Sequence, residues 1–278
     1  MMRYFSILRT SRSQQAQAIA LVVILVNGLL FSGPLYRLVG ADIALGINNL
    51  SNIVAALISI WLGYRLWRSS PRGESQRMVW GCLVTGLALW MVAEISWDAT
   101  QVLQGIQLPS ASAADVAWTL GYVAVILGLT VRLSTLRMRL SKAWQYASLA
   151  AFGVIVVLAG AYLIIPALNA SKTGISYKIF VDLFYPVCAL VVACLALLLV
   201  LLLDGGLLSR PWVVIAIACF FVAVSNLLYA FAFSNGLYQV DPPAGLDLLS
   251  YLVDLSYSAA YVLMALGIYL QARLQAAA

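Results

Sequence analysis

Two carboxylates stand late in the third apolar stretch of the chain, where helix capping does not account for them. If a helix starts at Met78, Glu94 lies roughly 24 Å along it, near the outer edge of the hydrocarbon. The helical period places it on one face with four other polar or aromatic side chains, namely Trp90, Trp97, Asp98 and Gln101. Acidic groups in a membrane are costly and usually face a cavity or a partner. These carboxylates could be protonated, hydrogen-bonded to Asn or Tyr, or bound to a cation.

Two interpretations of this face stay open. In one, it belongs to an interfacial aromatic belt with solvated carboxylates. In the other, it lines an outward-facing acidic and aromatic cavity that binds a small ligand, a lipid or a cation. The candidate ligand-binding residues are Glu94, Trp97, Asp98, Asp115, Trp118, Tyr122, Asn226, Tyr229, Asp254, Tyr257 and Tyr261.

Four aspartates also have a simpler, structural explanation. Each stands near the expected start of a helix that enters the membrane from outside; they are Asp42, Asp115, Asp182 and Asp254. A carboxylate at such a position caps free backbone N–H groups and meets the positive end of the helix dipole. Ser112 and Asp115 even have the spacing of a capping box.

The elements that must position these residues are membrane helices. The chain is 64% hydrophobic and 9% charged, whereas a soluble domain carries roughly 25% charged residues. Each span needs about 20 apolar residues and must be helical, because lipid offers no partner to backbone groups. Eight stretches qualify: 16–36, 44–67, 78–101, 114–133, 144–167, 179–203, 211–233 and 252–272. The sequence therefore predicts an all-α integral membrane protein with eight transmembrane helices.

The second half of the chain repeats the first. At one offset, Gly28, Pro34, Glu94 and Trp97 match Gly160, Pro166, Asn226 and Tyr229. At a slightly larger offset, Asp115, Trp118 and Tyr122 match Asp254, Tyr257 and Tyr261. We expect two parallel four-helix repeats, residues 1–142 and 143–278, related by a pseudo-two-fold axis along the membrane normal.

Lys and Arg concentrate in alternate loops. Only Arg37, Lys172 and Lys178 fall on the other side, so the positive-inside rule predicts cytoplasmic N- and C-termini. The net charge of +6 follows from this asymmetry, and no basic domain stands free of the membrane to bind nucleic acid. The lipid bilayer is the expected partner.

Several chemistries are not expected. The chain has no histidine, which disfavours His-ligated haem or zinc. Its cysteines fall inside apolar stretches without metal-ligand spacing, and no serine elbow or phosphate loop is present. The sequence therefore predicts neither an enzyme nor a metal site, and it identifies no cofactor.

One segment resembles a known family. Pro109 and Ser110, followed by Ala114, Asp115, Trp118 and Tyr122, resemble the Pro-Ser-x-Ala-Asp-x-x-Tyr-x-x-x-Tyr signature of bacterial membrane sensory modules. Those multi-helix modules precede diguanylate cyclase, phosphodiesterase or histidine kinase domains. The resemblance implies a sensor in the bacterial cytoplasmic (inner) membrane. No output domain follows Arg273, so a cytoplasmic signalling protein is the expected partner.

Three functions remain open. The first is a receptor-like or accessory module that binds a ligand outside and signals through a cytoplasmic partner. The second is a transporter or ion pathway, which parallel repeats and intramembrane carboxylates also suit. The third is a structural subunit of a membrane complex.

Overall fold

The computed structural model describes residues 11–104, 112–136, 150, 153, 157, 177–203, 209–235, 237–238 and 247–276. These residues form helices without any strand. The helices are α2 (Ser11–Phe31), α3 (Gly33–Val39), α4 (Ala41–Ser69), α5 (Ser75–Gln104), α6 (Ala113–Ser134), α9 (Tyr177–Leu202), α10 (Ser209–Ser234) and α11 (Leu248–Gln275). All except α3 are long and apolar enough to cross a membrane, which makes seven candidate spans within the described part. The protein is therefore a polytopic, all-helical membrane protein.

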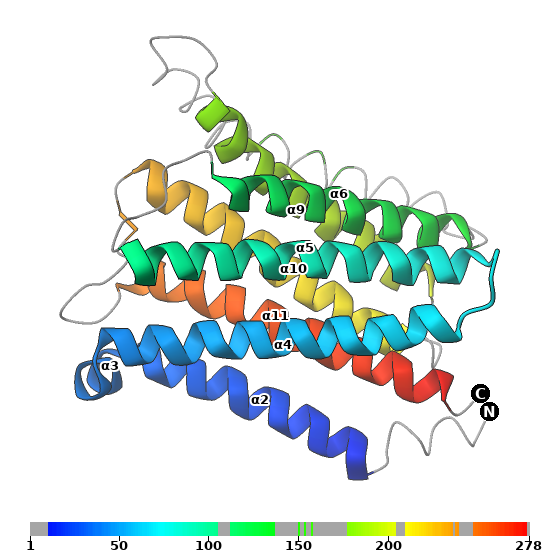
Figure 1. The fold of residues 1–278 in the computed structure, drawn as a ribbon, viewed down its shortest axis with the longest axis horizontal. Helices are drawn as coiled ribbons and strands as arrows, with labels where there is room; N and C mark the ends of the chain where they lie inside the picture. Colours follow the sequence, from blue (N-terminus) through cyan, green and yellow to red (C-terminus); the bar gives the residue numbers. More distant parts are fainter. Residues whose placement is uncertain are drawn as a thin grey trace.

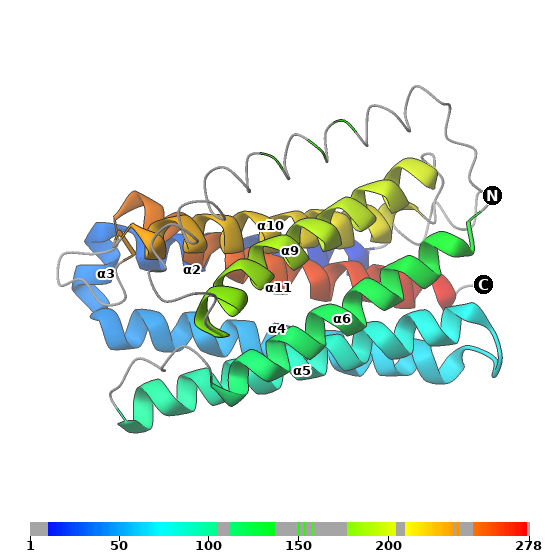
Figure 2. The same cartoon turned by 90° about the horizontal axis from the view of Figure 1, so that it is seen from above.

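The long helices lie side by side in one bundle, with the start of α2 and the end of α11 at the same end of it (Figures 1 and 2). α5 packs along α6, and α10 packs along both α9 and α11. α4 lies between α5 and α11, while α2 covers α11 at the edge of the bundle. α11 thus touches α2, α4 and α10, which explains why it is the most buried of the spans.

The first expected helix has the predicted length but lies about five residues earlier in the chain, since it begins at Ser11 rather than residue 16. It ends at Phe31 rather than residue 36, and a separate short helix, α3, begins at Gly33. Pro34 explains the break, because proline lacks an N–H and its ring crowds the preceding turn. Pro34 instead occupies the first turn of α3, where no N–H is needed, and Ser32 before it is extended. The fifth expected stretch, 144–167, lies outside the described residues apart from positions 150, 153 and 157.

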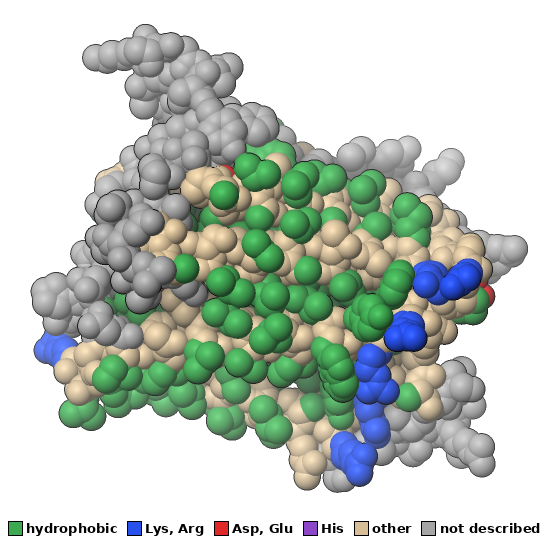
Figure 3. Space-filling model, viewed as in Figure 1, with side chains coloured by type: hydrophobic (Ala, Val, Ile, Leu, Met, Phe, Trp, Pro, Cys, Tyr) green, Lys and Arg blue, Asp and Glu red, His purple; other side chains and the backbone are tan. Residues whose placement is uncertain are grey.

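The flanks of the bundle are apolar and one of its ends is basic. Large side chains such as Leu21, Trp61 and Phe220 are exposed on the helices, as expected for surfaces that face lipid rather than water. Figure 3 shows Lys and Arg side chains gathered at the end where α2 begins and α11 ends. Arg68 and Arg273 stand there in the last turns of α4 and α11. A membrane-spanning bundle accounts for both features.

Candidate functional site

Four helices bring the predicted site residues together near the end opposite the basic one. α5 contributes Glu94, and the antiparallel α6 contributes Trp118 from the facing turn. α11 contributes Tyr257 and Tyr261, one helical turn apart, and α10 contributes Asn226. Residues from both halves of the sequence therefore meet around a single carboxylate.

The Glu94 carboxylate is the centre of a hydrogen-bond network. Its Oε1 atom accepts from the Trp118 indole, with an Nε1–Oε1 distance of 3.1 Å, and from the Tyr257 hydroxyl. The Tyr261 hydroxyl also reaches the carboxylate and lies 3.3 Å from the Tyr257 hydroxyl. Oriented donors of this kind stabilise a partly buried acceptor more than they would in water. Glu94 thus links α5 to both α6 and α11.

Aromatic rings surround this network. The ring centroids of Trp97 and Trp118 are 5.8 Å apart, and those of Trp90 and Tyr122 are 4.9 Å apart. The Trp90 indole donates to the Trp118 carbonyl oxygen at 3.3 Å. Such edge and tilted ring contacts fix side-chain orientation. Together they hold the Trp118 indole, which donates to Glu94, in place.

Asn226, the predicted counterpart of Glu94, completes the cluster of side chains that we call the Glu94 belt, which comprises Glu94, Trp118, Tyr122, Asn226, Tyr257 and Tyr261. Its Nδ2 atom donates to the Val222 carbonyl oxygen at 2.9 Å. Its side chain also lies within hydrogen-bonding reach of the Tyr122 hydroxyl on α6. The belt therefore continues from the Glu94 network to α10.

Asp115 has the capping role that its position predicted, and a second role as well. Its Oδ2 accepts from the backbone N–H of Ser112 at 2.7 Å, which is half of a capping box. Its Oδ1 accepts from the Tyr185 hydroxyl of α9, also at 2.7 Å. The Tyr185 ring lies against Trp118 and Tyr122, so the Asp115 site adjoins the Glu94 network.

The capping role predicted for Asp254 is wrong. α11 starts earlier than expected, and its N-cap is Asp247, which accepts from the Ser250 N–H at 2.7 Å. Asp254 instead accepts from the Tyr238 hydroxyl at 2.9 Å. The Tyr238 ring meets Tyr229 edge-on at 5.0 Å. Burial, followed by the nearby Asp254 carboxylate, raises the pKa of the Tyr238 phenol well above its ordinary value, so this phenol remains a proton donor at neutral pH.

The remaining predictions have mixed outcomes. The Asp98 side chain, like those of Asp42 and Asp182, lies outside the described residues. Asp182 is, moreover, in the second turn of α9 rather than its first. Tyr185 and Tyr238 are site residues that the sequence did not predict. Tyr185 could have been noticed as a phenol in the outer part of an apolar helix, beside the helix-interior Pro186, whereas Tyr238 had no comparable signal.

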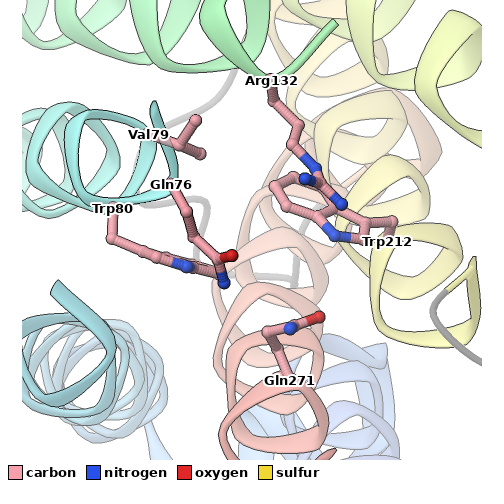
Figure 4. Close-up of a pocket in the computed structure, with 6 residues that line it drawn as sticks. All are labelled: Gln76, Val79, Trp80, Arg132, Trp212 and Gln271. Atoms are coloured by element: carbon pink, nitrogen blue, oxygen red, sulfur yellow. The ribbon is translucent and has the colours of Figure 1, made fainter. Parts of the chain in front are cut away.

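A separate small pocket lies at the basic end of the bundle. Figure 4 shows side chains of four helices around it, namely Gln76, Val79, Trp80, Arg132, Trp212 and Gln271. The space open to the centre of a water-sized sphere is about 10 Å³, which is what one water molecule requires. The Arg132 guanidinium lies over the Trp212 ring, 5.3 Å from its centroid. The pocket is therefore a polar spot between helices of both halves, far from Glu94.

Comparison with protein-family models, curated proteins and solved structures finds no match for this chain. Among the described residues, no group of three or more His, Cys, Asp or Glu side chains is arranged to hold a metal ion.

Proposed function

We propose that the protein is a receptor-like or accessory membrane module that binds a small ligand, lipid or cation at the Glu94 belt. The observation that carries this proposal is the Glu94 carboxylate, which accepts from Trp118 on α6 and from Tyr257 on α11. A ligand that competes for these donors or for the carboxylate would loosen or tighten three helices at once. The resemblance to bacterial sensory modules points the same way, and a cytoplasmic signalling protein is the proposed partner.

The proposal includes two parallel four-helix repeats, residues 1–142 and 143–278, with eight spans in total. Matching positions make matching contacts. Trp80 and Trp212 occupy equivalent positions and face each other, with ring centroids 5.8 Å apart. A Cβ added at Gly128 would lie 3.2 Å from the Val79 carbonyl oxygen, and one at Gly267 would lie 3.1 Å from that of Pro211. The same offsets relate these residues in the sequence, which supports a duplicated α5–α6 and α10–α11 unit.

The basic end is proposed to face the cytoplasm of a bacterium, with the Glu94 belt outside. The Arg residues in the last turns of α4, α6 and α11 support this orientation. α5 and α11 extend from the belt to the basic end, where Gln76 and Gln271 line the small pocket. A shift of either helix at the belt would therefore reach the cytoplasmic surface.

Hydrogen exchange in the purified full chain, reconstituted in lipid nanodiscs, tests this coupling without a known ligand. In Glu94→Gln we expect a several-fold change in exchange at residues 69–76 and 132–136, at the basic end. Ser96→Ala is the matched control, because Ser96 lies on the same helix and its hydroxyl donates within its own turn, to the Val92 carbonyl oxygen. A folded Glu94→Gln variant whose exchange at the basic end equals that of the control would overturn the proposal.

Transport is the second candidate, and the pocket around Arg132 favours it. With this pocket, polar side chains lie near both ends of the bundle, Glu94 near one end and Gln271 near the basic end. Flux of a small cation such as tetramethylammonium into proteoliposomes, lost in Glu94→Gln, would favour transport over reception. Signalling-type coupling without flux would favour the receptor.

A further inference from the structure

Four polar side chains are buried where α2, α4 and α11 meet. Asn27, Asn48 and Asn52 are 1%, 6% and 3% exposed, and Ser258 is 0% exposed. The Oδ1 atoms of the three asparagines and the Oγ atom of Ser258 have no hydrogen-bond partner within the part of the chain that the structure describes. Most buried polar atoms have one, so four orphan oxygens in one region require an explanation.

The three asparagines lie on α2 and α4, which meet along a seam that the Asn27–Ser51 bond crosses. Asn48 and Asn52 are four residues apart on α4 and share its buried face. Asn27 on α2 donates from Nδ2 to the Ser51 hydroxyl of α4 at 3.1 Å, and to its own turn at Val23. The Asn27 amide is thereby fixed with its oxygen unused. Three amide oxygens are thus held within about two turns of α4.

Ser258 belongs to the face of α11 that packs on this seam. At one level, Tyr251 lies against Gly28 of α2. At a deeper level, Val262 clusters with Ala20 of α2. Positions 251, 258 and 262 fall on one helical face, so Ser258 faces α2 between these two contacts. α11 touches both α2 and α4 (Figure 1), which completes a three-helix junction.

The four side chains at the junction offer a cation oxygen ligands but no negative charge. Amide and hydroxyl oxygens are hard ligands of the kind that hold Na⁺ and K⁺ in membrane proteins. None of the four side chains carries a charge, and a neutral oxygen set suits a monovalent ion better than a divalent one. Asn48 and Asn52 lie roughly 10 Å and 16 Å along α4 from Ala41, well inside the hydrocarbon. There, an unsatisfied oxygen is especially costly.

We propose that Asn27, Asn48, Asn52 and Ser258 form a binding site for a monovalent cation of the Na⁺ class. The ion ties α2 to α4 and α11 and uses oxygens that the helices leave free. This site is separate from the Glu94 belt in its residues and in its chemistry, because it contains no carboxylate.

Thermal unfolding of the purified full chain in nanodiscs tests the site. The protein is compared in NaCl, KCl and N-methylglucamine chloride at equal ionic strength. We expect Na⁺ to raise the unfolding temperature by about 3 °C over N-methylglucamine, by preferential binding to the folded state. Equal unfolding temperatures in all three salts would mean that ordered water, and not a cation, satisfies the four oxygen atoms. That result would overturn the proposal.

Two variants and a control assign the effect to these residues. Asn52→Leu removes one orphan oxygen with little change in volume, so it folds without the ion and loses the Na⁺ response. Asn48→Asp keeps an oxygen at this position and adds a negative charge. We therefore expect the half-maximal shift in unfolding temperature at about tenfold less Na⁺, the size of effect expected for groups that interact within one site. Asn235→Ala, at the exposed end of α10, keeps the full response. A Na⁺ response unchanged in both junction variants would also overturn the site.

Discussion

At the scale of single residues, Glu94 is informative because its hydrogen-bond donors come from two other helices, α6 and α11. An isolated carboxylate in hydrocarbon is costly, and the phenol and indole donors that bond Glu94 reduce this cost. The sequence showed that Glu94 shares a face with tryptophans, and that Tyr257 and Tyr261 match Trp118 and Tyr122. It could not show that Tyr257 bonds Glu94 directly, because that contact depends on how α5 and α11 pack.

The bond between Glu94 and Tyr257 predicts energetic coupling between them. In a double-mutant cycle of Glu94→Gln and Tyr257→Phe, we expect a coupling free energy of about 1–3 kcal/mol, because the bond involves a partly buried acceptor that can be charged. Denaturant unfolding of the four proteins in nanodiscs measures it. Effects that add to within about 0.5 kcal/mol would show that the contact contributes nothing specific.

Asp115 predicts a second residue-scale effect. Tyr185→Phe removes the hydroxyl that donates to Asp115 Oδ1, and it leaves the capping bond from the Ser112 N–H to Asp115 Oδ2 intact. We expect a loss of about 1–2 kcal/mol in unfolding free energy, because a buried oxygen loses its partner. Tyr64→Phe, on the lipid-exposed side of α4 where Tyr64 is 43% exposed, serves as the control and should change stability little. An equal effect in the two variants would contradict a specific role for Tyr185.

At the scale of the elements, apolar length predicted the helices well but not their ends. α4, α6 and α10 begin and end within a few residues of the stretches expected. The errors come from local chemistry that hydropathy does not weigh, as Pro34 splits the first helix and Asp247 starts α11 earlier. The second error changed the role of Asp254 from a helix cap to a partner of Tyr238.

The close crossing of α5 and α6 predicts which glycines matter. A Cβ at Gly86 would lie 2.9 Å from the Gly121 carbonyl oxygen and also meet Val125, so the backbones would have to move apart. We expect Gly86→Ala to cost about 1–3 kcal/mol in unfolding free energy. Gly46 lies inside α4 with open space around it, and Gly46→Ala should stabilise the protein by up to about 1 kcal/mol through helix propensity. Denaturant unfolding of these two variants separates the effect of helix packing from that of helix propensity. A Gly86→Ala variant with an unchanged unfolding free energy would contradict the close crossing.

At the scale of the whole molecule, the sequence predicted a bundle, and the predicted repeat suggested which residues would face one another. The pairing of Trp80 with Trp212 agrees with two halves packed across a shared interface. The sequence did not indicate the Asn27–Ser51 bond or the small pocket beside Arg132. Both depend on tertiary packing of polar residues that, read singly, could have served as ordinary helix–helix contacts.

The orientation of the bundle gives the last prediction. Leu38 in α3 is 80% exposed, and Ser75 at the start of α5 is exposed at the opposite, basic end. With that end in the cytoplasm, Leu38→Cys should react with a membrane-impermeant maleimide in intact bacterial spheroplasts, and Ser75→Cys only after permeabilisation. The unsubstituted protein is the control, since its own four cysteines lie within apolar helices and two of them are buried. The reverse pattern would turn the Glu94 belt toward the cytoplasm, and the proposed receptor would then have to sense an internal ligand.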